Sequence, residues 1–167
     1  MKKIAVLIEN LYDEQELIYP YHRLREDFEV HLVGTKKDHS YKSKSGLEIK
    51  STHSSDEINP QDYDGVIIPG GFSPDYMRKS EKTIDFVTKV FENGNPVAAI
   101  CHGPWMLASS LDLEGKNITS VESIKTDLVN AGANWSDQEV VVDGNMVTSR
   151  TPKDLPAFIK EFIKLIK

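Results

Sequence analysis

Cysteine is nearly absent from this 167-residue chain, which contains one, Cys101. A single cysteine cannot form an internal disulfide, as is usual in a reducing compartment, so we expect a cytoplasmic protein. Long hydrophobic runs are missing as well, and none approaches the length of a membrane span. The apolar run at residues 4–8 is too short for the core of a signal peptide, and acidic residues follow it directly. We therefore expect neither a membrane segment nor a secretory leader.

Basic residues are outnumbered, because 20 Lys and Arg face 26 Asp and Glu, for a formal net charge of −6. A surface that binds nucleic acid is normally basic, so this balance argues against a nucleic-acid partner. The five histidines are scattered and, with one cysteine, give no zinc-ligand spacing. We expect no metal site and no cofactor. Repeats, low-complexity segments and linkers are also missing, so residues 1–167 are expected to form one domain.

Apolar strand-like runs alternate with amphipathic helix-like stretches along the chain. The predicted strands are 3–8, 29–33, 65–68, 97–100, 116–120, 139–142 and 146–149, with a short hairpin edge at 46–50. The predicted helices are 13–27, 80–93, one that begins near 105, 124–131 and 153–166. This alternation predicts an α/β fold whose mainly parallel sheet is covered by helices on both faces. Pro20 falls inside the first helix and predicts a kink or a late start.

Unusual residues stand at the ends of several predicted strands. They are residues 9–10, 69–71, 101–102 and Arg150. In an open parallel sheet, ligands bind at the carboxyl ends of the strands near a topological switch point. If these strands are neighbours, their ends line one crevice, and that crevice is the expected site.

Cys101 stands between an apolar strand and a Gly103-Pro104 pair that opens the next helix. A strand that turns into a helix through such a sequence is typical of a nucleophile elbow. The amino end of the helix favours an anion, so we expect the thiol to ionise more easily there. Most free cysteines are core residues, but a core cysteine needs no such junction. Cys101 is predicted to be a nucleophile, with an oxidisable thiol as the alternative.

His102 is the last histidine in the chain. This excludes the hydrolase order in which the histidine follows the nucleophile well downstream. The base is therefore His102 or an earlier histidine, and we favour structural or solvent-exposed roles for the earlier ones, which are His22, His31, His39 and His53. Gly70 and Gly71 either form a tight turn or supply a backbone N–H to an oxyanion hole with the N–H of His102.

Acidic residues gather at the start of the first predicted helix. They are Glu9, Asp13, Glu14 and Glu16. Helix electrostatics and a solvated face explain such a cluster. Alternatively, one carboxyl group points to Cys101, where burial and the thiolate charge would raise its pKa and let it donate a hydrogen bond to sulfur. The residue types do not choose between the four.

Segments along nearly the whole chain resemble the ThiJ/PfpI family, in particular its branch of PfpI-type intracellular peptidases. They lie at residues 16–23, 64–71, 99–104, 130–132, 139–145 and 149–155, and Ala-Ile-Cys-His-Gly-Pro at 99–104 is the most specific. The resemblance implies a flavodoxin-like three-layer sandwich and a reactive Cys101 held by Glu16. It also implies that Asp75 of a neighbouring subunit orients His102, so the protein would be at least a homodimer with its site at an interface.

Four positions depart from the pattern of this branch. Asp75 and Asp13 stand where glutamate is often found, Val121 where a tyrosine is, and Trp105 where a smaller polar residue is. With Gly70 and Gly71, both Asp13 and Trp105 are expected to line the substrate pocket. These changes alter the pocket more than the nucleophile.

Members of the family are described as peptidases, as glyoxalase III enzymes that convert methylglyoxal to lactate, and as deglycases that repair methylglyoxal- or glyoxal-modified proteins. In each case Cys101 would attack a carbonyl while the N–H groups of Gly71 and His102 hold the oxyanion. A pocket narrowed by Trp105 favours a small carbonyl substrate or its protein adduct, in a stress-response enzyme. The alternative is a redox-sensing or chaperone-like protein that is not an enzyme. A glutamine amidotransferase needs a histidine after the cysteine, which this chain lacks.

Overall fold

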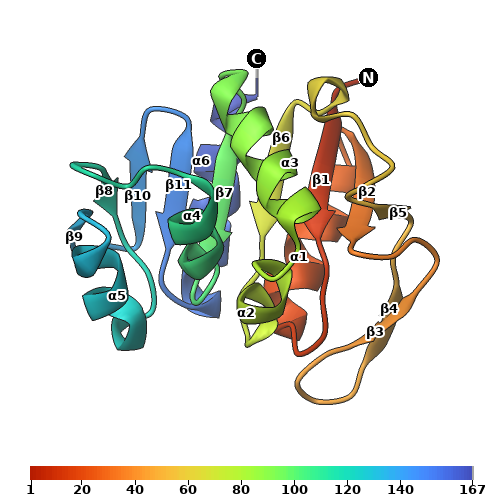
Figure 1. Ribbon diagram of the computed structural model, residues 1–167, viewed down its shortest axis with the longest axis horizontal. Coiled ribbons are helices and arrows are strands. Elements are labelled where there is room, and N and C mark those ends of the chain that lie inside the picture. The colour runs from red at the N-terminus through yellow and green to blue at the C-terminus, as the bar shows by residue number, and fades with distance from the viewer. Residues whose placement is uncertain (167) are drawn as a thin grey trace.

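The computed structural model describes residues 1–166 and has a seven-stranded sheet at its centre (Figure 1). The strand order is β10-β11-β7-β6-β1-β2-β5. The strands are β1 (Lys3–Leu7), β2 (Glu29–Gly34), β5 (His53–Ser54), β6 (Gly65–Ile68), β7 (Val97–Ile100), β10 (Val140–Asp143) and β11 (Met146–Ser149). All neighbouring pairs are parallel except β10 and β11, which form the hairpin predicted around residues 143–145. The mainly parallel sheet is therefore confirmed.

Helices cover both faces of the sheet, with α3 and α4 in front and α1 and α6 behind in the view of Figure 1. The helices are α1 (Glu14–Arg25), α2 (Ser73–Met77), α3 (Glu81–Glu92), α4 (Pro104–Ser110), α5 (Lys125–Asn130) and α6 (Leu155–Leu165). Alternate residues of a strand point to opposite faces, so each central strand feeds two cores. In β7, Val97 and Ala99 pack with α3 and α4, whereas Ala98 and Ile100 pack with α1 and α6.

Short elements complete the chain outside the main sheet. They are the antiparallel pair β3 (Ser40–Lys42) and β4 (Glu48–Lys50), the pair β8 (Asn117–Ile118) and β9 (Asn134–Trp135), and 3₁₀ turns at Pro60–Asp62, Glu122–Ile124 and Pro152–Asp154. Neither α2 nor β5 was expected, because both lie in polar segments without a clear period. No helix among residues 1–166 is long and apolar enough to cross a membrane.

Pro20 does not delay α1, which begins at Glu14 and runs through the proline to Arg25. The expected late start is therefore wrong. Leu17 and Leu24 are fully buried on either side of the proline. Their packing against the sheet holds both turns of the helix in place although proline contributes no N–H.

The four strand ends with unusual residues belong to adjacent strands, because β11, β7, β6 and β1 are consecutive in the sheet. Their carboxyl ends lie at one edge, as the expected crevice requires. Residues 69–71 and Arg150 thus follow the strands on either side of β7, whereas residues 9–10 lie one strand farther away and bond to Thr35 and Lys42.

Candidate active site

Cys101 has the backbone conformation of a nucleophile elbow, with φ at +62°. A left-handed conformation costs a residue other than glycine about 1–2 kcal/mol, so the surrounding contacts must hold it. The N–H of Cys101 donates to the carbonyl of Ser149 at 3.1 Å, and its own carbonyl accepts from Val121 at 3.0 Å. A Cβ at Gly103 would lie 2.7 Å from the carbonyl oxygen of Ile68, so the turn requires glycine there.

Glu16 is the carboxyl group that the fold places at this thiol. It is fully buried, and its Oε1 accepts a hydrogen bond of 2.8 Å from the N–H of Gly70. Burial, followed by the charge of Asp13, raises the pKa of Glu16 to about 8. Its Oε2 has no hydrogen-bond partner among residues 1–166. Near neutral pH the carboxyl group therefore holds a proton that it can donate.

The thiol of Cys101 is harder to ionise than the sequence predicted. Burial, followed by the charge of Glu16, raises the pKa of Cys101 to about 12. The predicted direction is therefore wrong, because α4 has only seven residues and its amino end does not compensate for the lost hydration. A proton on Glu16 removes the second of these two causes. The thiol and the carboxyl group thus titrate as a coupled pair.

His102 lies directly beside the nucleophile, with Nδ1 3.6 Å from the sulfur of Cys101. Burial and the nearby charge of Lys44 lower the pKa of His102, so the ring is neutral at pH 7 and can accept a proton. Its other nitrogen, Nε2, lies 3.4 Å from Oγ of Ser123. Ser123 could not be singled out from the sequence, since a serine in a polar loop has no distinguishing pattern.

The two glycines after β6 have different roles. The N–H of Gly70 is bound to Glu16, so Gly70 does not serve the oxyanion hole as expected. The N–H of Gly71 donates to no acceptor within residues 1–166, and Gly71 has φ of +66°. The N–H of His102 faces the Cys101 sulfur and lowers the thiol pKa. Gly71 and His102 therefore present the donors that an oxyanion needs.

Asp13 is the N-cap residue of α1. Its side chain is buried, accepts from the N–H groups of Gln15 and Glu16 at 3.0 and 3.2 Å, and pairs with Lys44 at 2.6 Å. The expectation that Asp13 also lines the substrate pocket stays a prediction. Aspartate is a preferred N-cap residue, which explains its place here.

Asp75 lies on α2 and binds Arg78 of the same helix, at 3.0 Å from Nε and 2.6 Å from Nη2. It makes no hydrogen bond to His102 of its own chain in the described part of the structure. Its expected role concerns a neighbouring subunit and stays a prediction.

Trp105 forms a fixed wall beside His102, with ring centroids 5.0 Å apart. Its Nε1 donates to Asp127 at 2.8 Å, and the guanidinium of Arg78 lies 5.1 Å from its ring. Phe72 meets the same ring edge-on at 6.1 Å and is itself exposed. The site therefore has an aromatic side made by α2 and α4.

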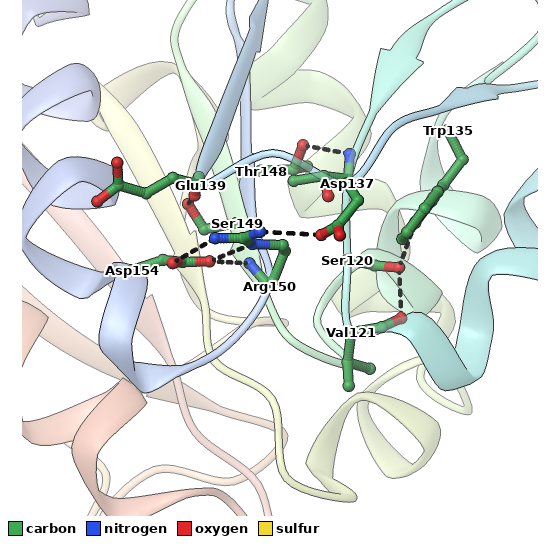
Figure 2. Close-up of polar contacts among 10 residues, drawn as sticks. Ser120, Val121, Trp135, Asp137, Glu139, Thr148, Ser149, Arg150 and Asp154 are labelled. Carbon is green, nitrogen blue, oxygen red and sulfur yellow. Dashed lines mark hydrogen bonds and ion pairs between the residues drawn. The ribbon is translucent and has the colours of Figure 1, made fainter.

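Arg150, at the next strand end, is a structural clamp (Figure 2). Its backbone N–H and its Nε donate to Asp154 at 3.0 and 2.9 Å, and its Nη1 donates to Asp137 at 2.9 Å. Asp154 is buried, and its hydrogen bonds with Arg150 lower its pKa in spite of that burial. These hydrogen bonds occupy the guanidinium and connect the end of β11 to the start of α6 and to the segment before β10.

A cavity of about 630 Å³ lies elsewhere, between α1 and the start of α6. Its apolar lining includes Ile18, Tyr19 and Pro156 but neither Cys101 nor His102. Residues 1–166 contain no group of three or more His, Cys, Asp or Glu side chains placed to hold a metal ion.

Comparison with known proteins shows similarity over nearly the whole chain. The model of the DJ-1/PfpI family matches residues 2–165. Deglycase PH1704 of Pyrococcus horikoshii is 44% identical over 166 residues, which are 99% of this chain and 99% of that protein. YraA of Bacillus subtilis, whose name makes it a candidate cysteine protease, is 41% identical over 167 residues and 99% of each chain.

A solved two-domain protein from Anabaena variabilis, with DJ-1/ThiJ/PfpI-like and ferritin-like domains, matches with a TM-score of 0.95 and 40% identity. The match covers 98% of the present chain and 48% of that longer one, so this chain spans about half of its length. The resemblance and the flavodoxin-like sandwich expected from the sequence are confirmed.

Proposed function

Because the chain belongs to the DJ-1/PfpI family, we propose that it is a cysteine-dependent enzyme of the deglycase type, acting on small carbonyl compounds such as methylglyoxal or on their adducts with protein amines. The observation that carries this proposal is the elbow at Cys101. Cys101 has a strained backbone, the neutral ring of His102 lies beside its sulfur, the N–H of His102 faces the sulfur, and the N–H of Gly71 has no acceptor among residues 1–166. This set is what addition of a thiol to a carbonyl requires.

In the proposed reaction, the sulfur of Cys101 attacks the aldehyde carbon while its proton passes to Nδ1 of His102. The carbonyl oxygen becomes an oxyanion that the N–H groups of Gly71 and His102 hold, and it takes up a proton to give a hemithioacetal. The hydrogen on that carbon moves as a proton to the adjacent carbon, and the hydroxyl proton moves to the oxygen of that adjacent carbon, which converts the adduct into a thioester of lactate. Water then releases lactate and the thiol, so methylglyoxal and water give lactate without an external oxidant.

Glu16 supplies a second proton carrier beside the sulfur. With a pKa of about 8, it exists in both protonation states near neutral pH and can give or take a proton during the transfer between the two carbons. With a glycated amine, the former aldehyde carbon carries a hydroxyl group and the nitrogen; the C–S bond forms as the C–N bond breaks, and the leaving amine takes the thiol proton by way of His102. The same hemithioacetal results, so the final products are lactate and the free amine.

The size of the substrate is argued from Trp105. Its ring is held by Asp127 and Arg78 and stands beside His102, so it narrows the approach to the nucleophile. A small carbonyl compound or an exposed modified side chain fits such an approach better than a folded polypeptide. A peptidase is the competing activity, and a redox sensor is disfavoured because burial raises the pKa of the Cys101 thiol to about 12.

Replacement of the nucleophile tests the proposal. Cys101→Ser should reduce methylglyoxal consumption and lactate formation at least about a hundredfold. Ser109→Ala is the matched control, since Ser109 is an exposed residue of the adjacent helix α4. Release of arginine from its methylglyoxal adduct and cleavage of a fluorogenic peptide, measured in parallel, separate deglycase from peptidase. Unchanged methylglyoxal turnover in Cys101→Ser would contradict the proposal.

Assembly into a homodimer is a further part of the proposal, supported by the family resemblance. Both contacts of Arg78 are made to Oδ1 of Asp75, so Asp75 of a neighbouring subunit could use Oδ2 to orient His102 without giving up Arg78. Sedimentation of the wild type, together with activity of Asp75→Asn, tests this arrangement. A loss of activity without dissociation supports an acid supplied by the partner subunit.

A further inference from the structure

The seven-stranded sheet has two edge strands, and they differ in how well they are protected. At one edge, β5 has only two residues, and so short a strand offers little for another chain to pair with. At the other edge, β10 has four residues, Val-Val-Val-Asp, without a proline or a lysine. Proteins commonly use such residues to block pairing at an exposed edge. The β10 edge therefore lacks the protection that β5 has.

The backbone groups of Val140 and Val142 point away from the sheet. Ser149 directs its carbonyl oxygen toward β7, so its neighbour in β11, Thr148, directs its backbone groups toward β10, where it pairs with Val141. Only every second residue of an antiparallel strand bonds to a given neighbouring strand, so Val141 bonds to β11 while Val140 and Val142 face outward. Their N–H and carbonyl groups have no other hydrogen-bond partner among residues 1–166.

A groove of about 410 Å³ lies along this edge and leaves room beside the strand. The residues that line it together with β10 are uncharged and come from β8, β9 and the loop after β9: Asn117, Asn134, Trp135, Ser136 and Gln138. Their amide and hydroxyl groups can donate and accept hydrogen bonds. The Trp135 ring is held in place, since its Nε1 donates to Ser120 at 2.9 Å (Figure 2). The groove therefore offers what an extended peptide requires, an unpaired strand and further polar groups beside it.

Acidic side chains stand at both ends of β10. Glu139 precedes the strand and is exposed; its backbone carbonyl accepts from Ser149, and its carboxylate has no partner among the residues drawn in Figure 2. Asp143 ends the strand, and its Oδ2 accepts from the N–H of Asn117 at 2.7 Å. Opposite charges across a strand pair are stabilising. A bound segment with Lys or Arg near each end would therefore complement this strand.

The same charges disfavour a second copy of this chain at the β10 edge. Antiparallel pairing of two β10 strands about Val141 would place Glu139 of each copy opposite Asp143 of the other. Like charges directly opposite each other destabilise a strand pair, and each chain already carries a formal net charge of −6. A basic segment of another protein avoids this repulsion.

We propose that β10 binds an extended peptide segment of a partner protein by strand addition, and that this segment alternates apolar residues with other residues and is basic at both ends. Its backbone would bond to the outward groups of Val140 and Val142. Its apolar side chains would lie beside those two valines, of which Val142 is 43% exposed. The site uses neither Cys101 nor His102, so it does not depend on the reaction proposed for them.

Peptides with blocked backbone groups test this proposal on the unaltered protein. A fluorescein-labelled peptide that contains Lys-Val-Asn-Val-Lys should bind in fluorescence anisotropy, and its analogue with glutamate in place of lysine should bind at least about tenfold more weakly. N-methylation of the two valines removes the donors that face β10 and should weaken binding at least about tenfold, whereas N-methylation of the asparagine, which faces away, should change it less than about twofold. Absence of binding by the basic peptide, or equal effects of the two methylation patterns, would overturn the proposal.

Measurements on the protein locate the site. Glu139→Gln should weaken binding of the basic peptide about two- to threefold, and Glu57→Gln, the same change at an exposed residue after β5, should leave it unchanged. Amide hydrogen exchange at Val140 and Val142 should slow when the peptide binds, while Val141, already bonded to β11, should change little. Unchanged exchange at Val140 and Val142 would contradict binding at this edge. Sedimentation with and without peptide should give the same oligomer, since dissociation by the peptide would mean that a second copy occupies β10.

Discussion

Two strand-to-helix junctions stand side by side at one edge of the sheet, and they are built in opposite ways. The β7–α4 junction has a strained Cys101, and the N–H of Gly71 beside it has no acceptor in the described chain. At the β11–α6 junction, Arg150 uses its backbone and side-chain donors on Asp154 and Asp137. A single hydrogen bond, from the N–H of Cys101 to the carbonyl of Ser149, joins them. The β11–α6 junction, whose polar groups are paired, supports the edge, and the β7–α4 junction is where we propose that the chemistry takes place.

The largest effect should come from removing the nucleophile in two ways. Cys101→Ala and Cys101→Gly should each lose at least about a hundredfold in activity. At most positions an alanine variant is more stable than a glycine variant. At Cys101 the order should be reversed, because glycine adopts a positive φ without strain and alanine does not. Cys101→Gly should be about 1 kcal/mol more stable than Cys101→Ala in urea unfolding.

The same pair of substitutions at Ser109, inside α4, provides the matched control. There glycine should be the less stable replacement by about 1 kcal/mol, as in an ordinary helix. If glycine is the less stable replacement at both positions, the backbone of Cys101 is not strained.

Two of the buried carboxyl groups, Glu16 and Asp154, should give the stability of the protein opposite dependences on pH. Because the pKa of Glu16 is raised to about 8 in the folded protein, its contribution is present below its unfolded value and is lost as pH rises toward 8. Between pH 5 and pH 8, the wild type should therefore lose a free energy of unfolding on the order of a few kcal/mol relative to Glu16→Gln. Asp154, whose pKa is lowered, should contribute stability above its unfolded pKa and lose it as pH falls.

Urea unfolding of both proteins over this pH range measures the difference. Parallel curves for the wild type and Glu16→Gln would contradict a raised pKa at Glu16. Glutamine keeps an oxygen that can accept the hydrogen bond from Gly70. Glu16→Gln therefore removes the ionisable group while the packing at that position is kept.

The smallest effects should distinguish Asp154 from Asp137, the two aspartates that bind Arg150 at the β11–α6 junction. Asp154→Ala removes a buried acceptor of several bonds and should destabilise the protein by about 2–3 kcal/mol, with turnover per folded molecule nearly unchanged. Asp137 has a side chain that is 73% exposed, so Asp137→Ala should cost less than about 0.5 kcal/mol. Thermal unfolding measures both, and equal effects would mean that burial does not set the strength of this cluster.

Periodicity and turn chemistry were sufficient to predict six of the seven strands of the sheet, because strands buried on both faces have continuous apolar runs, and to predict the elbow, which has a glycine and a proline at fixed places. They failed for α2 and β5, whose stability comes from tertiary contacts. The N–H of Gly70 could not be assigned to Glu16 from the sequence, since that bond joins residues 54 positions apart. The direction of the Cys101 pKa was wrong for a similar reason, because hydration is lost only when the layers close. Ser123 gives no sequence signal at all.

The N-cap residue of α1 affects the acid–base properties of the site. Asp13 holds the helix start through the N–H of Glu16 and also contributes to the raised pKa of that residue. The first turn of α1 therefore influences the pKa of Glu16. Substitutions at Asp13, or at its partner Lys44, would change the pKa of Glu16. They would also act on the Cys101 thiol, whose pKa Asp13 raises, and on His102, whose pKa Lys44 lowers.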